Sequence, residues 1–148
     1  MQNVVSRSDT GTDEEYHLDE QVGHILRRAS QRHASIFQAR MIDLTPTQFA
    51  AVIKLAEIGE CSQNRLGRLT AMDVATIKGV VDRLHKKGFV TLRPDPTDKR
   101  RTLISLTPVG KARIGELRQI GAAISNDTLD PLTKSERRNF LRLLQKIT

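Results

Sequence analysis

The chain has 148 residues, of which 28% are charged and 38% hydrophobic, and its formal net charge at pH 7 is +7. This length suits one domain with its own hydrophobic core, and the positive charge suits a polyanionic partner such as nucleic acid. A single cysteine excludes an internal disulfide, and four phenylalanines, one tyrosine and no tryptophan offer little surface for stacking single-stranded bases. No apolar run suits a signal peptide or a membrane span, so we expect a cytoplasmic protein.

The amino-terminal part divides into a polar tail and a long helix. Residues 1–16 are polar and show no hydrophobic period, which predicts a flexible tail. From Leu18 to about Arg40 apolar residues recur at helical spacing, which predicts one helix. Within its apolar stripe we expect His33 to be a hydrogen-bonded core histidine rather than a ligand. The stripe consists of Val22, Leu26, Ala29, His33, Ile36 and Phe37.

A second helix is predicted where three start signals coincide. A threonine can cap the helix, a proline suits its first position, and a glutamine at the third position completes a capping box. These residues are Thr45, Pro46 and Gln48. Phe49 follows on the face that we expect to be buried, and Gly59 ends the helix.

The segment from Ser62 to Leu106 is typical of two helices joined by a tight turn and followed by a β-hairpin. Ser62 can cap a short helix over residues 63–69, and Asp73 can cap the next one. One face of that second helix is apolar, because hydrophobic residues recur at i, i+3, i+4 and i+7. These residues are Ile77, Val80, Val81 and Leu84. The opposite face begins with small and polar residues, which allows close approach to base edges in a major groove.

Two short strands, 89–93 and 101–106, are predicted on either side of the basic loop 94–100. A helix-turn-helix followed by a hairpin is a winged helix. The fold class is therefore predicted to be mostly α with a small β-hairpin wing. A small helical core with a solvated basic loop is the alternative.

The carboxyl-terminal part is predicted to be helical. One helix runs from Pro108 to about Ser125, residues 126–132 form a break, and a capping box of Thr133 and Glu136 opens a last helix. A winged helix alone would leave the apolar stripes of the end helices exposed, so these helices need a partner. The stripes contain Leu117, Ile120 and Ile124 in one helix, and Phe140, Leu141, Leu144 and Ile147 in the other.

Three segments resemble the MarR family of bacterial winged-helix transcriptional regulators. Val80-Val81-Asp82-Arg83-Leu84 and Lys87-Gly88-Phe89-Val90 are similar to the recognition helix of that family and its exit. The segment from Asp98 to Thr107 is similar to the wing pattern of the family, an Asp-x-Arg followed by a strand that ends in Leu-Thr. The resemblance covers about residues 20–147.

The resemblance implies a homodimer with two functional regions. Helices at about 18–40 and 108–147 would interlock with those of a second copy. Residues of about 45–107 would form the DNA-binding lobe of a single domain that spans 17–148.

The predicted DNA-binding residues lie around the helix-turn-helix and at the wing. Basic side chains can contact phosphates, which set affinity and register, whereas outward residues at the front of the recognition helix can contact base edges. Gly79 offers no side chain to contact a base there, but it lets the backbone approach the DNA closely. By resemblance Arg100 enters a minor groove and Asp98 pairs with a wing arginine, although turn chemistry also explains Asp98. The predicted set is Arg65, Arg68, Thr76, Lys78, Gly79, Lys99, Arg100 and Arg101, with Asp98 as wing support.

A candidate effector site follows from the same resemblance. Most family members release DNA when a small anionic aromatic compound binds between the dimer and DNA-binding regions. His24, Arg28 and Ser35 share one edge of the first predicted helix, next to its apolar stripe, and the guanidinium fork of Arg28 suits a carboxylate. Phe49 completes the predicted set as an apolar wall. A solvated or dimer-bridging role for Arg28 is the alternative.

No pattern of catalytic residues is present, so we expect no enzyme and no cofactor. His17 and His24 are two helical turns apart without further ligands, so no metal site is predicted. Cys61 is either a small half-buried hydrophobe or a redox switch.

The sequence thus predicts a homodimeric repressor of a pseudopalindromic DNA operator that is released by a small aromatic acid. The alternatives are a redox-responsive regulator acting through Cys61 and a non-specific basic nucleic-acid-binding protein.

Overall fold

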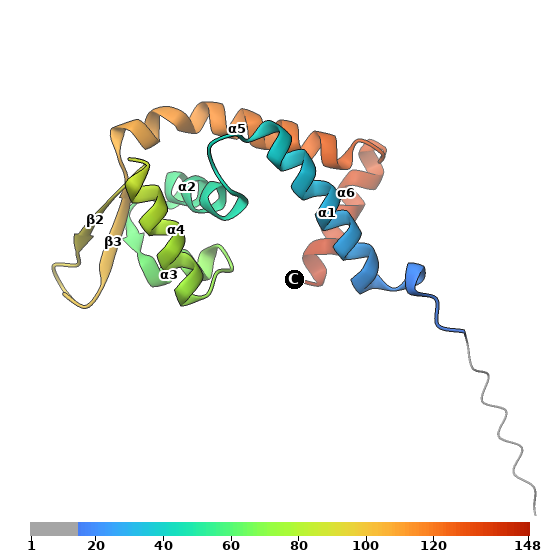
Figure 1. The fold of residues 1–148 in the computed structure, drawn as a ribbon, viewed down its shortest axis with the longest axis horizontal. Helices are drawn as coiled ribbons and strands as arrows, with labels where there is room; N and C mark the ends of the chain where they lie inside the picture. The colour runs from blue at the N-terminus through green and yellow to red at the C-terminus, as the bar shows by residue number, and fades with distance from the viewer. Residues whose placement is uncertain (1–14) are drawn as a thin grey trace, which may run out of the picture.

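The computed structural model describes residues 15–148, so the tail predicted for residues 1–16 lies almost entirely outside the described residues. The chain forms an arch: a winged-helix lobe lies at one end, α1 and α6 lie at the other, and α5 runs across the top (Figure 1). The elements in order are η1 (Leu18–Glu20), α1 (Val22–Arg40), α2 (Pro46–Ile58), β1 (Cys61–Ser62), α3 (Gln63–Leu69), α4 (Val74–Lys86), β2 (Val90–Pro94), β3 (Thr102–Leu106), α5 (Pro108–Leu129) and α6 (Lys134–Lys146).

The helix starts follow the predicted capping residues. The side chain of Thr45 accepts a hydrogen bond from the backbone N–H of Gln48, whose own side chain bonds back to the cap. Thr133 and Glu136 form the same reciprocal box at α6. Each box satisfies amides that the first helical turn leaves without a partner. These local signals placed both helix starts correctly.

The core of the lobe lies between α2, α3, α4 and the sheet. The apolar face predicted for α4 is buried, and Ile77, Val81 and Leu84 are at most 1% exposed. The sheet has the strand order β1-β3-β2, and both pairs are antiparallel. Ile104, in the central strand, pairs with Cys61 on one side and Leu92 on the other. The short strand β1 is not predicted by the sequence pattern, because two residues show no alternation.

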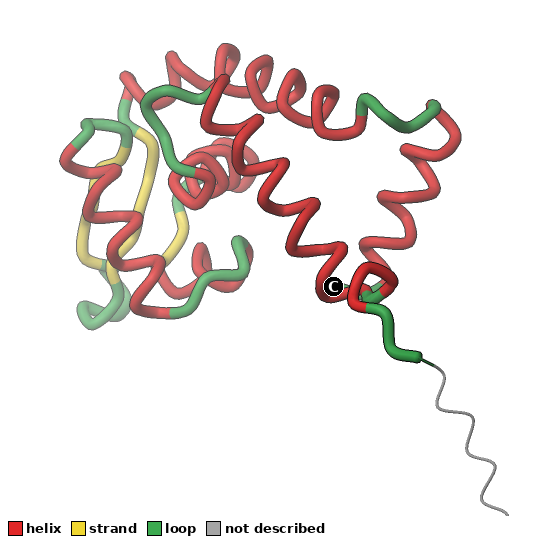
Figure 2. Tube along the Cα trace, turned by 45° about the vertical axis from the view of Figure 1, so that its right-hand side comes forward, coloured by secondary structure: helices red, strands yellow, loops and turns green. Residues whose placement is uncertain are grey.

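Two predictions about the long helices are wrong at their ends. The first helix does not begin at Leu18, because η1 is followed by an extended residue, Gln21, before α1 starts. The helix predicted to end near Ser125 continues to Leu129. It continues because its polar residues bond to other groups: Thr128 bonds to a carbonyl one turn earlier, and Asp127 bonds to α1. Figure 2 shows the shorter loop that remains before α6.

The expectation of a core histidine at position 33 is also wrong in the single chain. His33 is exposed, although its Nδ1 lies 2.8 Å from the hydroxyl of Thr128 on α5. Beside it, Arg32 donates hydrogen bonds to the backbone carbonyls of Asp127 and Thr128. These contacts fix α1 against the far end of α5. No helix within residues 15–148 combines the length and apolar character needed to cross a bilayer.

Candidate functional site

The front of α4 presents a small, polar surface. Asp73 caps the helix by accepting a 2.7 Å hydrogen bond from the backbone N–H of Thr76, and this bond lowers the pKa of Asp73. Val74, Ala75 and Thr76 are exposed in the first turn. The face opposite the buried one is exposed in both the first and the last turns of α4. Such a helix fits a DNA major groove.

Two cationic side chains of α4 make contacts that the sequence analysis did not predict. Lys78 forms an ion pair with Asp82 at 3.1 Å, on one flank of the exposed face. Arg83 covers Gly79: a Cβ added to the glycine would lie 3.2 Å from an Nη atom of Arg83. Arg83 is absent from the predicted set, although its i, i+4 spacing from Gly79 could have revealed this contact.

The tip of the wing is organised by one carboxylate. Asp98 accepts hydrogen bonds from the backbone N–H and the Nε of Arg100, both at 3.1 Å, and lies 3.7 Å from the Nε of Arg101. The side-chain bond from Arg100, followed by the backbone bond, lowers the pKa of Asp98. The Arg100 side chain is nevertheless 91% exposed. Asp98 thus both shapes the turn and pairs with wing arginines, so both interpretations of this residue are correct.

The base of the wing is fixed by a pair that the sequence did not reveal. Arg93 on β2 donates two hydrogen bonds to the carboxylate of Glu60, which precedes β1. The hydrogen bond from Arg93 lowers the pKa of Glu60. A paired fork of this kind restrains orientation as well as distance. It therefore ties the hairpin to the rest of the lobe.

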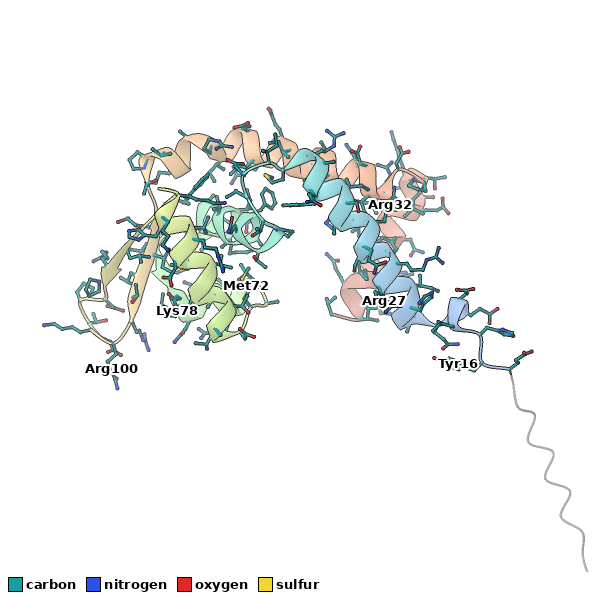
Figure 3. The ribbon with its side chains drawn as sticks, in the orientation of Figure 1. Tyr16, Arg27, Arg32, Met72, Lys78 and Arg100 are labelled. Carbon is teal, nitrogen blue, oxygen red and sulfur yellow. The ribbon has the colours of Figure 1, made fainter. Side chains whose placement is uncertain are left out.

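The remaining predicted DNA-binding residues are exposed cations around the same lobe. Arg65 and Arg68 lie on α3, and Lys99 lies in the wing loop. Their side chains make no hydrogen bond or ion pair with other residues between 15 and 148. Figure 3 shows that Lys78 and Arg100 both lie on the side of the lobe opposite α5. The structure thus brings the recognition helix and the wing to one surface.

An apolar groove lies at the other end of the arch, between α1, the end of α5 and α6. It encloses about 350 Å³ and is lined by apolar residues such as Leu26, Leu141 and Leu144, with His33 and Thr128 at its polar edge. Several further large apolar side chains on these helices remain exposed. They include Val22, Ile25, Phe140, Leu143 and Ile147.

The predicted effector residues do not form one pocket within a single chain. His24 lies 3.4 Å from Asp19, and the hydroxyl of Ser35 donates to a carbonyl of its own helix. Arg28 is exposed. By helical geometry these three residues lie on the side of α1 opposite its apolar stripe, rather than next to it. Phe49 is packed away from them, edge-to-face with Phe37 at 5.9 Å.

A second hollow lies where α1 meets the winged-helix lobe. It encloses about 400 Å³ and is lined by Phe37, Met41 and Leu44, among others, with Lys87 at its edge. The ammonium of Lys87 donates to the side chain of Gln48 at 2.9 Å and to the backbone carbonyl of Asp43. This hollow therefore lies between α1, the helix expected to contact a second copy, and the end of α4. Sequence spacing gave no sign of it, because its walls come from distant segments.

Cys61 has the surroundings of a structural residue. It is only 4% exposed, and burial raises the pKa of its thiol. A reactive cysteine needs the opposite, an accessible thiolate. Among the described residues, no three side chains of the kinds that bind metals gather at one place.

The fold and these surfaces define a winged-helix protein of the transcription-regulator class. A sequence model of the MarR family matches residues 44–102. The HTH-type transcriptional repressor NicR of Pseudomonas putida is 41% identical over 134 residues, which cover 89% of this chain and 85% of NicR. The chain therefore belongs to the MarR family, as the resemblance predicted.

Solved structures agree with this assignment. A probable transcriptional regulator from Pseudomonas aeruginosa superposes with a TM-score of 0.86 and 47% identity, over 89% of this chain and all of the other. BpsR of Bordetella bronchiseptica, studied for regulation of its DNA binding by 6-hydroxynicotinic acid, gives 0.85 and 40%, over 89% and 96%. A cysteine-to-serine mutant of Escherichia coli MarR bound to operator DNA gives 0.78 and 25%, over 84% and 91%. These relatives are regulators, and the chain is accordingly a MarR-family transcriptional regulator.

Proposed function

We propose that this protein is a homodimeric repressor that binds a pseudopalindromic operator in the bacterial nucleoid and is released by a small aromatic carboxylate. The observation that carries the proposal is the common surface of α4 and the wing, which presents exposed cations on one side of the lobe. A positive surface of this shape neutralises phosphates while the helix contacts bases. Operator binding by Escherichia coli MarR and repression by NicR support it.

The first test is whether binding depends on sequence. Duplexes bound by the protein are selected from a random pool and then challenged with competitor DNA at moderate salt. We expect a two-fold symmetric sequence to survive, because specific complexes are typically 10³–10⁷ times tighter than non-specific ones. Loss of all binding to competitor would instead favour a non-specific basic binder.

The second test concerns the wing tip. Arg100→Ala is expected to weaken operator binding and to reduce the slope of log K against log salt by about one unit, because one phosphate-like contact is lost. The fold should be unchanged, since the side chain is almost fully exposed. Lys134→Ala, which removes one charge at the distant start of α6, is the control and should leave the slope unchanged. An unchanged slope for Arg100→Ala would show that the tip does not touch DNA.

The third test concerns the effector. 6-Hydroxynicotinic acid is the probe, because it regulates DNA binding by BpsR. Arg28→Ala is expected to keep operator binding but to lose roughly 1.5–3 kcal/mol of ligand binding, the range for a charge-assisted hydrogen bond. His24→Ala and Ser35→Ala should lose less, because each contact would be a single hydrogen bond. Displacement of the operator by the acid is titrated for each variant.

Lys87→Gln tests whether the acid binds beside Lys87 rather than at Arg28. Lys87 lies beside the hollow between α1 and α4, whereas Arg28 lies on the exposed edge of α1. If Arg28→Ala responds to the acid as the parent does while Lys87→Gln does not, the proposed role of Arg28 is wrong and the acid binds in the hollow. The buried thiol of Cys61 lends no support to the redox alternative.

A further inference from the structure

The outward face of α4 lacks side chains where a recognition helix needs them. With 3.6 residues per turn, Ala75 and Gly79 lie near the centre of the face opposite the buried residues. Neither can donate a hydrogen bond from its side chain to a base. Lys78 lies on the flank, where its ammonium already pairs with Asp82. The first turns therefore carry no side chain at the centre of the outward face that could donate a hydrogen bond to a base.

The side chain of Arg83, one turn further along the helix, lies over this central position. Side chains of a helix point back toward its amino terminus, so a residue at i+4 covers the surface at i. The position of one Arg83 Nη atom, 3.2 Å from where a Cβ of Gly79 would lie, shows this arrangement directly. A Cβ at position 79 would make the guanidinium shift by a few tenths of an ångström, so glycine allows it to lie closer to the helix.

The Arg83 guanidinium is also available for a ligand. The side chain is exposed and makes no hydrogen bond or ion pair with other residues between 15 and 148. This contrasts with Arg100 and Arg93, whose guanidinium groups are held by carboxylates. All N–H donors of Arg83 therefore remain free on the outward face of α4.

We propose that Arg83 is a specificity-determining residue that reads a guanine in the major groove, in place of the side chain that Gly79 lacks. An arginine fork matches the O6 and N7 acceptors of guanine with two parallel hydrogen bonds. Phosphates are reached from the flanks of a recognition helix, whereas Arg83 reaches its central line. The inference rests on the proposed function, because it assumes that α4 enters the groove of an operator.

The experiment compares Arg83→Lys with the parent protein on the operator selected from the random pool. Each G·C pair of a half-site is replaced in turn by A·T, symmetrically in both half-sites. The parent should discriminate against one such replacement by roughly 5- to 150-fold, the value of a bidentate contact. Arg83→Lys keeps the charge but loses the fork, so this discrimination should disappear while the salt slope stays the same.

Gly79→Ala tests the same contact without altering the arginine. The added methyl group would lie 3.2 Å from the guanidinium, so the arginine must shift by a few tenths of an ångström, and discrimination at the same base pair should fall. The melting temperature of this variant should rise or stay equal, because alanine favours a helix more than glycine does. Arg118→Lys, the same change at an exposed arginine on α5, outside the predicted DNA-binding set, is the control and should leave discrimination intact at every pair.

The outcomes distinguish a failure of the proposed function from a failure of the proposed role of Arg83. If the parent protein selects no operator, the proposed function is wrong and the role of Arg83 falls with it. If the parent selects an operator but Arg83→Lys and Gly79→Ala keep its preference at every G·C pair, only the present inference is wrong.

Discussion

Replacing Gly110 with alanine is expected to lower the free energy of unfolding by about 3 kcal/mol, near the upper end of the usual range for overpacking. A Cβ at this position would lie 2.3 Å from the carbonyl oxygen of Phe89, far inside normal contact distance. A flexible side chain could rotate away, but the carbonyl belongs to the backbone. The start of α5 would have to move from the lobe instead.

This movement would break other contacts at the same place. The Phe89 carbonyl also accepts a hydrogen bond from the backbone N–H of Thr107 at 3.0 Å, and Thr107 caps α5 by accepting from Gly110. A shift of α5 therefore loosens both its cap and its attachment to Phe89, the residue before β2. Because α5 connects the lobe to the other end of the arch, we also expect weaker operator binding (Figure 1).

Gly115→Ala is the matched control for this prediction. Gly115 lies in the same helix, and a Cβ there would meet no atom within 4 Å. The change should stabilise the protein by up to about 1 kcal/mol through helix propensity. Urea unfolding of both variants at one protein concentration gives the comparison. Equal stability of Gly110→Ala and the parent would show that the start of α5 can move away from Phe89 at no cost.

The parts of the fold that sequence predicted well depend on short-range rules. The caps of α2 and α6 join residues three apart, and the apolar face of α4 repeats within two turns. At the site, the pairing of Asp98 with Arg100 spans two residues and follows from turn chemistry. These interactions form wherever the residues occur at that spacing, so one sequence suffices to predict them.

The parts that sequence missed depend on distant partners. α5 continues past Ser125 to Leu129, and in this last turn Asp127 accepts a hydrogen bond from Arg40 on α1, 87 residues away. The pair of Glu60 and Arg93, 33 residues apart, likewise has no local sign. Neither pattern nor propensity encodes which helices meet, and the hollow beside Lys87 was invisible for the same reason.

The contact between Arg83 and Gly79 is local in sequence, and the prediction nevertheless missed it. Its spacing of four residues is local, and the direction of helical side chains predicts that the arginine covers the glycine. The prediction treated Gly79 as a position that has no side chain and lets the backbone approach closely. Considering what the next turn places over an outward glycine would have revealed the contact from sequence.

Replacing Leu141 with aspartate is expected to make the protein monomeric and to lower operator affinity by a factor of about 100 or more, the scale of a lost second attachment. In the single chain Leu141 is 46% exposed beside the groove between α1 and α6, so an aspartate there can remain hydrated. In the proposed homodimer the groove is covered by a second copy. The carboxylate would then be buried without a partner, and two-fold symmetry would introduce it twice.

The loss of affinity follows from the loss of linkage between half-sites. A dimer holds two recognition helices about 34 Å apart, so binding of one helix brings the second to its half-site. Such linkage increases affinity by roughly 10²–10⁴ without any new contact. A monomer with an unchanged lobe would retain only the weaker binding to one half-site.

Asn139→Asp is the control, because it adds the same charge to α6 but on its polar face, beside Arg142. Sedimentation should show a dimer for the parent and for Asn139→Asp, and a monomer for Leu141→Asp. Deleting residues 133–148 should instead cause aggregation, because removing α6 uncovers the apolar side of α1 without adding a charge. A dimeric Leu141→Asp variant with parental operator affinity would place the interface elsewhere. The exposed apolar side chains of α1 and α6 would then need a different partner.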